Sequence, residues 1–247
     1  MSTMTQREYR DGVGLFVLSL VFLSFFTFSF VHADPTGGTI SGAVTETAPN
    51  QTPDSRTDGR GTITTMVLST VQQDQHWKAY VGNVTGSLTL DDADNLTIYD
   101  WDLTGITGEV YASRFDNISW TSMACANATD INLESTFHNM TDADADDINS
   151  TFNWTIHKTF NIGSDTIPSN TCNSTVTYAN DTRQVPDGNN PYQEVLIKDE
   201  NHYLIYMTSI DDNSQGFDNE SYDFQMIVAE SNVKPTATSY YFYVELG

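Results

Sequence analysis

Residues 192–210 read YQEVLIKDENHYLIYMTSI and contain two apolar runs separated by a short polar segment. Val, Ile, Leu and Tyr dominate both runs, which is a composition typical of β-strands. The intervening residues Asp199–Asn201 have the polar character of a turn. The stretch therefore predicts a β-hairpin formed by Tyr192–Lys198 and Tyr203–Ile210.

Short runs of similar composition recur on both sides of this hairpin, separated by clusters of Gly, Asn and Asp. They predict further strands at Ile63–Val71, Trp77–Val84, Gly86–Leu90, Leu96–Leu103, Gly108–Phe115, Phe152–Phe160, Thr175–Tyr178, Tyr222–Glu230 and Ser239–Leu246. We expect the four carboxy-terminal strands to form a meander and Asp130–His138 to form a short helix. Many short strands without long helices favour an all-β domain over residues 62–247, a two-layer β-sandwich of immunoglobulin-like or jelly-roll-like type.

Cys125 and Cys172 are the two cysteines of the chain. In an oxidising exterior two thiols usually pair, and closing a loop of this length stabilises a fold by about 4 kcal/mol on the chain-entropy model. We therefore expect a disulfide that closes the sandwich, with a pair of buried, unpaired thiols as the alternative. A Cys-x-x-Cys motif is absent, so the cysteines indicate neither a metal site nor oxidoreductase chemistry.

An almost purely apolar run, Val13–Val31, precedes the β-rich region. At ~1.5 Å per residue, a helix of this length spans the ~30 Å hydrocarbon core of a bilayer. Residues 1–12 carry two arginines and read as a cytoplasmic segment, so 13–33 is either a transmembrane anchor or a signal segment cleaved before Asp34. The Pro-, Gly- and Thr-rich residues 34–61 predict a flexible tether.

The chain has 33 Asp and Glu residues against 10 Lys and Arg, which gives a net charge of −23. Such a surface repels nucleic acid and anionic lipid headgroups, so we expect no nucleic-acid partner. Self-repulsion at this density is tolerable in molar salt, because the Debye length shrinks to ~3 Å. The scarcity of Lys and the abundance of Asp and Thr resemble proteins of halophilic archaea, with an ordinary acidic secreted glycoprotein as the alternative.

Asn-X-Ser/Thr triplets, in which X is not Pro, are unusually frequent. Eleven asparagines begin such a sequon: Asn50, Asn83, Asn95, Asn117, Asn127, Asn139, Asn149, Asn153, Asn173, Asn180 and Asn219. This number exceeds the chance expectation for the composition and predicts a heavily N-glycosylated surface. The alternative is that Asn, Ser and Thr cluster in the turns of an acidic β-protein.

Clusters of acidic residues are candidate calcium sites, since Ca²⁺ needs several converging oxygen ligands. The candidate ligands are Asp211, Asn213, Gln215 and Asp218 in one loop, or Asp142, Asp144 and Asp146 in another. The first loop approaches the spacing of an EF-hand but has Tyr222 in place of the bidentate Glu. Solvated acidic turns are the alternative in both places.

Catalytic motifs are absent from the sequence: it has no Gly-x-Ser-x-Gly, no His-Glu-x-x-His and no Gly-rich phosphate loop. We therefore expect no enzymatic activity, although a hydrolase built on a chance pair of carboxylates stays open. The aromatic run Tyr240–Tyr243 belongs either to a central strand covered on both sides or to an exposed edge. Such an edge would add to a neighbouring subunit or form a carbohydrate platform.

The residues Arg10-Asp11-Gly12-Val13-Gly14-Leu15 introduce the apolar run, and an acidic β-rich domain follows it. In this segment and in general layout, the chain resembles archaeal type IV pilins and archaellins. The resemblance implies cleavage after Gly12 or Gly14 and packing of the freed helix into a filament core. The break at Pro35–Gly38 and the long tether depart from the pattern of these families.

The sequence therefore predicts a cell-surface glycoprotein of a halophilic archaeon with a structural or adhesive role. The amino-terminal helix would hold it at the membrane unless the protein is secreted. Its expected partners are the membrane, further copies of itself and other surface proteins, and it requires no cofactor apart from Ca²⁺ at the candidate loops. A subunit of an extracellular type IV pilus-like filament is the first alternative, and an extracellular hydrolase is the second.

Overall fold

The computed structural model describes residues 33–101, 103 and 105–247. The cytoplasmic segment and the apolar run predicted as an anchor or signal therefore lie outside the described residues. In the part of the chain that is described, no helix combines the length and the apolar character that crossing a bilayer requires.

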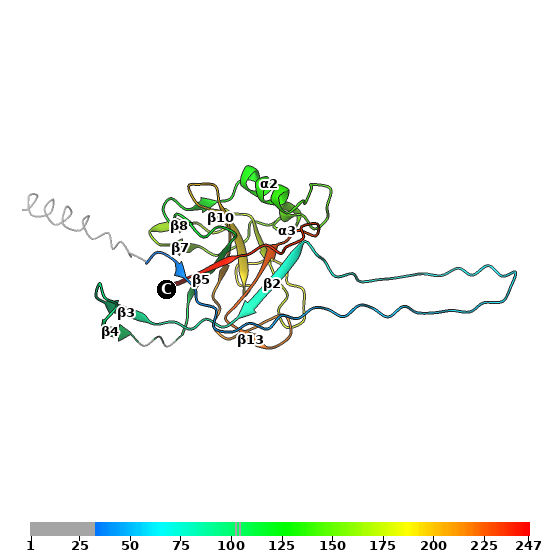
Figure 1. Cartoon of the computed structure of the whole chain (residues 1–247), viewed down its shortest axis with the longest axis horizontal. Coiled ribbons are helices and arrows are strands. Elements are labelled where there is room, and N and C mark those ends of the chain that lie inside the picture. Colours follow the sequence, from blue (N-terminus) through cyan, green and yellow to red (C-terminus); the bar gives the residue numbers. More distant parts are fainter. Residues whose placement is uncertain (1–32, 102, 104) are drawn as a thin grey trace, which may run out of the picture. The chain divides into compact units, whose positions relative to one another are not determined.

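Seven antiparallel strands form the main sheet (Figure 1). They are β1 (Thr36–Gly37), β5 (Gly108–Ser113), β6 (Ala124–Cys125), β9 (Ser174–Val176), β10 (Gln193–Lys198), β11 (Leu204–Ser209) and β15 (Tyr241–Leu246). Their order is β1-β15-β5-β11-β10-β6, and β9 also pairs with β10. The prediction of a predominantly β fold is confirmed.

Strands β10 and β11 form the predicted hairpin, with Val195 opposite Met207. The Asp199 carboxylate closes its turn by accepting hydrogen bonds from the backbone N–H groups of Asn201 (2.8 Å) and Tyr203 (2.9 Å). The first five residues of each strand are buried. Continuous burial requires packing on both faces of the sheet, which explains why Val195–Ile197 and Leu204–Met207 are apolar without alternation.

The expected carboxy-terminal meander is wrong. Strand β11 pairs with β5 and not with β14 (Phe224–Ala229), which pairs instead with β2 (Trp77–Gly82). Strand β5 also pairs with β15, so it lies between β11 and β15, in the place where the predicted meander would have put β14. Its segment Val110–Ala112 is apolar and fully buried, as a central position demands.

Separate hydrophobic clusters cover the two faces of the main sheet. On one face Leu196, Leu204 and Tyr206 pack with Met226 and Val228 of β14 and with Ile131, Ile148 and Phe152. On the other face Val195, Ile205 and Met207 pack with Phe160, Ile162 and Ile167. The last three residues belong to a hairpin of β7 (Phe160–Ile162) and β8 (Asp165–Ile167). The two-layer sandwich is not confirmed, because the central strands bury both of their faces.

The predicted helix is present as α2 (Ala128–Phe137). It begins two residues earlier than expected because Asn127 is its N-cap: the side-chain oxygen accepts from the N–H groups of Thr129 (2.8 Å) and Asp130 (3.2 Å). The Asp130 carboxylate accepts from the Asn127 N–H (2.9 Å), which completes a capping box. A single-turn helix, α3 (Ile148–Thr151), follows and is capped by Asp147.

The predicted tether begins inside the fold. Thr36–Gly37 form strand β1, which pairs with β15, and the Gly38 N–H donates to the Phe242 carbonyl (2.9 Å). Residues 39–75 are exposed and contain neither helix nor strand, so the strand predicted at Ile63–Val71 does not form. Its composition suits a strand, but the described chain offers it no pairing partner. Residues 39–75 therefore form a loop whose two ends are fixed at β1 and β2.

Cys125 and Cys172 form the predicted disulfide. Cys125 lies in β6, which pairs with one end of β10, and Cys172 precedes β9, which pairs with the other end of the same edge. Two short segments thus share one strand edge, and the disulfide joins them. The predicted strand at Phe152–Phe160 is replaced by an isolated bridge between Trp154 and Ser174.

Two small antiparallel pairs complete the described elements. One joins β12 (Ser214–Gln215) to β13 (Ser221–Tyr222). The other joins β3 (Leu88–Asp91) to β4 (Thr97–Trp101), with a register shift after Leu90. Both lie outside the main sheet.

Candidate functional site

The sequon asparagines lie at the surface with one exception. Ten of the eleven are exposed: Asn50, Asn83, Asn95, Asn117, Asn127, Asn139, Asn149, Asn153, Asn180 and Asn219. Asn173 is half-buried, and its side-chain amide donates to the Phe152 carbonyl (2.8 Å). Because a glycan would be attached to that amide nitrogen, Asn173 is the least suited of the set. Glycosylation of the others stays a prediction.

Four of these asparagines have a left-handed backbone conformation, which favours Asn whether or not the residue is glycosylated. Asn95, Asn139, Asn180 and Asn219 have φ angles between 53° and 70°. This left-handed region is costly for most L-residues, and Asn is among those that tolerate it best. Turn chemistry therefore contributes to the excess of sequons, in line with the alternative interpretation.

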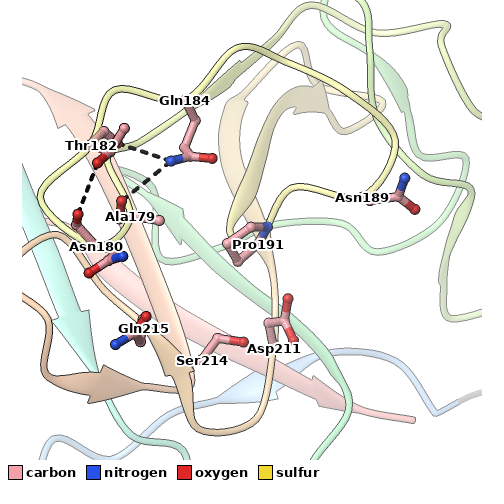
Figure 2. A pocket seen from close by; sticks show the side chains of 9 residues that line it. All are labelled: Ala179, Asn180, Thr182, Gln184, Asn189, Pro191, Asp211, Ser214 and Gln215. Carbon is pink, nitrogen blue, oxygen red and sulfur yellow. Dashed lines mark hydrogen bonds between the residues drawn. The ribbon is translucent and has the colours of Figure 1, made fainter.

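The first predicted calcium loop borders a shallow, open depression with a volume of about 510 Å³. Figure 2 shows Asp211, Ser214 and Gln215 on one side of it and Thr182 and Gln184 on the other. The lining side chains are polar and mostly uncharged, and they do not enclose a ligand. The depression offers oxygen atoms but no closed site.

Hydrogen bonds within this loop hold it as a turn. The Asp218 carboxylate accepts from the Tyr222 hydroxyl (3.0 Å), so Tyr222 has a structural role where an EF-hand would have its last ligand. The N–H of Asn213, which has a φ of 54°, donates to the Asp223 carboxylate (3.0 Å). Calcium binding here stays a prediction.

The second predicted calcium loop does not direct its three carboxylates to one point. Asp144 accepts from the N–H and the hydroxyl of Thr141 (2.7 and 3.0 Å). Asp142 is exposed. The Asp146 carboxylate instead contacts His76 Nδ1 at 2.7 Å.

Asp146 belongs to a group of three metal-ligating side chains with Asp74 and His76. One potential ligand atom from each residue lies within 4.8 Å of the other two. The Trp77 indole N–H donates to the Asp146 carbonyl (2.7 Å), and the His76 N–H donates to the Asp74 carboxylate (2.7 Å). Backbone and side-chain bonds thus hold residues about 70 positions apart in one place.

The charges of this group are coupled. Burial disfavours the charged imidazole of His76, but the hydrogen bond and the charge of Asp146 outweigh it and raise the His76 pKa. Burial and the neighbouring Asp146 also raise the pKa of Asp74. Burial opposes ionisation of Asp146 as well, yet hydrogen bonds from His76 and Asp74 lower its pKa. The three groups therefore attract positive charge to one point.

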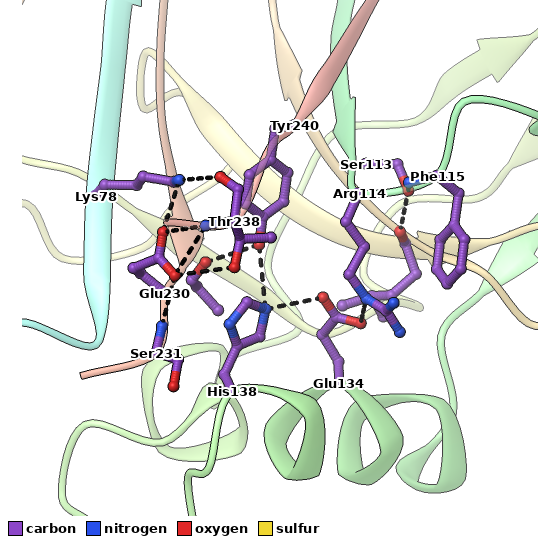
Figure 3. Close-up of polar contacts among 12 residues, drawn as sticks. Lys78, Ser113, Arg114, Phe115, Glu134, His138, Glu230, Ser231, Thr238 and Tyr240 are labelled. Atoms are coloured by element: carbon purple, nitrogen blue, oxygen red, sulfur yellow. Dashed lines mark hydrogen bonds and ion pairs between the residues drawn. The ribbon is translucent and has the colours of Figure 1, made fainter. Parts of the chain in front are cut away.

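A buried polar network links α2 to β15 (Figure 3). Glu134 accepts from Arg114 (2.8 Å) and contacts His138 (3.1 Å), and both Glu134 and His138 are almost fully buried. The Tyr240 hydroxyl donates to the Ala229 carbonyl (2.7 Å). The Tyr240 hydroxyl also lies 3.3 Å from His138 Nε2, whereas His138 Nδ1 is buried and has no hydrogen-bond partner among the described residues. Because the other groups pair with one another inside the fold, the network is structural.

The aromatic run Tyr240–Tyr243 belongs largely to the core. Phe242 packs edge-on against Tyr80, with ring centroids 4.9 Å apart, and Tyr243 packs against Trp120 at 5.1 Å. Tyr241 is the exposed member of the run. Since β1 also pairs with the outer edge of β15 at Tyr243 and Val244, the strand is covered there, in line with the first of the two alternatives.

Carboxylates also approach one another beside a smaller cavity of about 200 Å³, which Glu109 and His157 line. Glu109 lies opposite Glu245 in the β5–β15 pair. Burial and the charge of Glu245 raise the pKa of Glu109 to about 8. His157 is unsuited to be a base, because its Nε2 accepts from the N–H groups of Thr171 and Cys172 (3.0 Å each). The cavity therefore lacks a catalytic arrangement.

The hairpin of β3 and β4 presents an apolar surface that sequence patterns did not identify as a site. Leu88 lies opposite Trp101 and Leu90 opposite Tyr99, which places all four on one face. These side chains are 41–59% exposed, and none belongs to the two core clusters of the described residues. We call this set the hairpin face. The alternating sequences Leu-Thr-Leu and Tyr-Asp-Trp are the signal that indicates it, although the same alternation usually marks a buried face.

Comparisons with known proteins found no matching family model, no matching curated protein and no matching solved structure.

Proposed function

We propose that this chain is a cell-surface glycoprotein of a halophilic archaeon with a structural or adhesive role. The disulfide supports an oxidising exterior. The exposure of ten sequon asparagines leaves room for glycans, and the net charge of −23 suits molar salt. We also propose that β2 and β14 act as the second layer of an incomplete β-sandwich, since they pack on one face of the main sheet.

The observation that carries the adhesive role is the hairpin face. An isolated two-stranded hairpin is marginally stable in water, and a contiguous apolar patch at the surface favours contact with a partner. We propose a second copy of the chain as that partner, because two identical faces pack together about a twofold axis. Asp100 and Thr89 lie on the opposite side of the hairpin, so the contact does not bury them.

Matched tryptophan substitutions test this role in cells that express the full chain. Trp101 and Trp154 are 48% and 44% exposed, but only Trp101 belongs to the hairpin face. We expect Trp101→Ser to reduce cell-to-cell clumping about fivefold or more, since a buried aromatic at an interface centre contributes 2 kcal/mol or more. Trp154→Ser keeps the sequon at Asn153 and should leave clumping unchanged.

Labelling with a membrane-impermeant biotin reagent measures how much of each variant reaches the surface. Equal labelling with reduced clumping for Trp101→Ser alone supports the proposal. Equal clumping of both variants would exclude the hairpin face, and a wild-type chain inaccessible to the reagent would exclude the surface location.

A filament subunit remains the second candidate, and one observation favours it. Strand β1 starts at Thr36 and pairs with β15, so no free tether separates the predicted apolar run from the folded domain in sequence. A short connection suits a subunit whose helix packs in a filament core. Mass spectrometry of the native amino terminus decides: a chain starting at Val13 or Leu15 supports the filament, and one starting at Met1 or Asp34 contradicts it.

A further inference from the structure

We propose that Asp74, His76 and Asp146 form a binding site for a divalent transition-metal ion, with Zn²⁺ as the best-suited probe. The site differs in place, donor set and ion from the calcium loops predicted from sequence, although it shares Asp146 with one of them. It does not depend on the proposed surface role.

The geometry supports coordination because the donors come from two separate parts of the fold and converge. Asp74 and His76 lie at the entry to β2, whereas Asp146 lies in the loop between α2 and α3. The hydrogen bond from Trp77 to the Asp146 carbonyl and that from the His76 N–H to Asp74 fix the backbone on both sides. The Trp77 indole, the Asp146 carbonyl and the His76 N–H thus hold the site without themselves being ligands.

The distances fit a small ion after a modest adjustment. Zn²⁺ binds imidazole nitrogen and carboxylate oxygen at about 2.0–2.2 Å, so tetrahedral ligand pairs lie about 3.4 Å apart. The three potential ligand atoms already lie within 4.8 Å of one another. The contact of 2.7 Å between His76 Nδ1 and the Asp146 carboxylate must lengthen by roughly 0.7 Å when an ion replaces the shared proton.

The donor set selects the class of ion. One imidazole with two carboxylates suits Zn²⁺, Co²⁺ or Mn²⁺, whereas Ca²⁺ takes six to eight oxygen ligands. Three protein ligands leave a fourth position, and the exposed side of Asp74 lets water fill it. Exposure also gives the ion a path of entry.

A second observation concerns the other ring nitrogen of His76. Its Nε2 is buried and has no hydrogen-bond partner, although Asn232 lies near enough to affect the ring. Histidine ligands usually donate this second N–H to a carbonyl or carboxylate, which fixes the tautomer. A slight rotation that brings the Asn232 amide oxygen to Nε2 would complete such an arrangement.

A bound ion would fix the carboxyl end of the loop formed by residues 39–75. Asp74 is exposed and belongs to that loop, and His76 follows two residues later, directly before β2. Coordination would therefore hold the loop end against the acidic loop of Asp146. The site is a metal clamp, and its residues line neither of the two cavities described above.

Zn²⁺ titration of the full chain tests the proposal, in molar KCl with excess Mg²⁺ to suppress weak binding by the many surface carboxylates. We expect one saturable Zn²⁺ per chain. Asp74→Asn and His76→Gln should each weaken binding about tenfold or more. Asp142→Asn is the matched control, because Asp142 is an exposed acid in the loop of Asp146 but is not one of the three proposed ligands. This variant should bind Zn²⁺ as the wild type does.

The ¹⁵N chemical shift of His76 Nδ1 gives a second readout, since direct coordination displaces it and distant binding does not. Thermal unfolding of each variant confirms that it folds, and the exposed Asp74 makes Asp74→Asn the safest of them. The absence of one-to-one binding, equal binding by Asp74→Asn and Asp142→Asn, or an unchanged Nδ1 shift would each overturn the site and leave an ion pair.

Discussion

At the scale of single residues, Glu109 is a side chain whose ionisation opposes the fold. It faces Glu245 across two central strands, and Glu245 already accepts from the Tyr111 hydroxyl (3.0 Å) and the Gly163 N–H (3.0 Å). Burial and the charge of Glu245 oppose ionisation of Glu109, so Glu109 holds a proton at neutral pH. Its pKa of about 8 follows from burial first and from that neighbouring charge second.

This shift predicts a stability that falls with rising pH. Between the ordinary pKa of a Glu side chain, near 4.3, and about 8, the native state binds a proton that the unfolded state has lost. The contribution of Glu109 to the free energy of unfolding should therefore decrease between pH 5 and pH 8, by at most about 1.4 kcal/mol per pH unit. Because Glu109 lines a cavity and is not completely buried, solvent screening reduces that value. Glu109→Gln should remove this part of the slope, as measured by urea unfolding at several pH values.

The exposed Glu220 provides a matched control for Glu109→Gln. Glu220→Gln should leave the slope between pH 5 and pH 8 as in the wild type. A wild-type slope in Glu109→Gln would show that Glu109 is ionised at neutral pH and would contradict the assignment of the proton.

Site residues differ in how far sequence can identify them. Asp146 was recognised as a candidate ligand because it lies in an acidic run. Its partners Asp74 and His76 were not, since they lie about 70 residues away and meet it only when β2 and the α2–α3 loop pack together. Local spacing carries no information on such a contact, so the calcium prediction named Asp146 with different companions.

At the scale of elements, Asn127 combines two roles that substitution can separate. It is a sequon asparagine, and its side-chain oxygen caps α2. Asn127→Ala should lower the free energy of unfolding by about 1 kcal/mol, because two N–H groups of the first turn lose their acceptor. Asn127→Asp keeps the oxygen and should change it by only a few tenths. Urea unfolding of protein made without glycosylation measures both.

Asn149→Ala is the control for this pair, since Asn149 is an exposed sequon asparagine within α3. It should not lower the free energy of unfolding. If Asn127→Asp were as destabilising as Asn127→Ala, the capping bonds would not account for the loss.

Elements with a dense apolar pattern were predictable, and those with sparse patterns were not. The runs of β10 and β11 and the cluster in β5 indicate strands wherever they pack. The two-residue strand β1 has no such pattern, and its existence depends on the edge that β15 offers. Conversely, Ile63–Val71 has the composition of a strand but forms none, since no strand of the described chain pairs with it. Pairing is a tertiary property, which also explains why the meander was wrong.

At the scale of the whole molecule, the net charge of −23 is the dominant unbalanced quantity. Few of these charges are paired in the described chain. Two buried or partly buried carboxylates form ion pairs with Arg or Lys: Glu134 with Arg114, and Glu230 with Lys78. The remaining carboxylates repel one another across the surface. Screening reduces that repulsion more in the compact state than in the expanded unfolded chain, because the charges are closer together.

The free energy of unfolding should therefore rise with KCl concentration, steeply up to about 1 M, where the Debye length has fallen from ~10 Å to ~3 Å. A variant with Asp54→Asn, Asp94→Asn, Asp142→Asn and Asp181→Asn removes four exposed charges and should show a smaller rise. Sucrose serves as the uncharged control, since it strengthens burial without screening and should stabilise both proteins equally. An identical KCl dependence of the two proteins would mean that general salting-out, and not charge repulsion, makes this fold depend on salt.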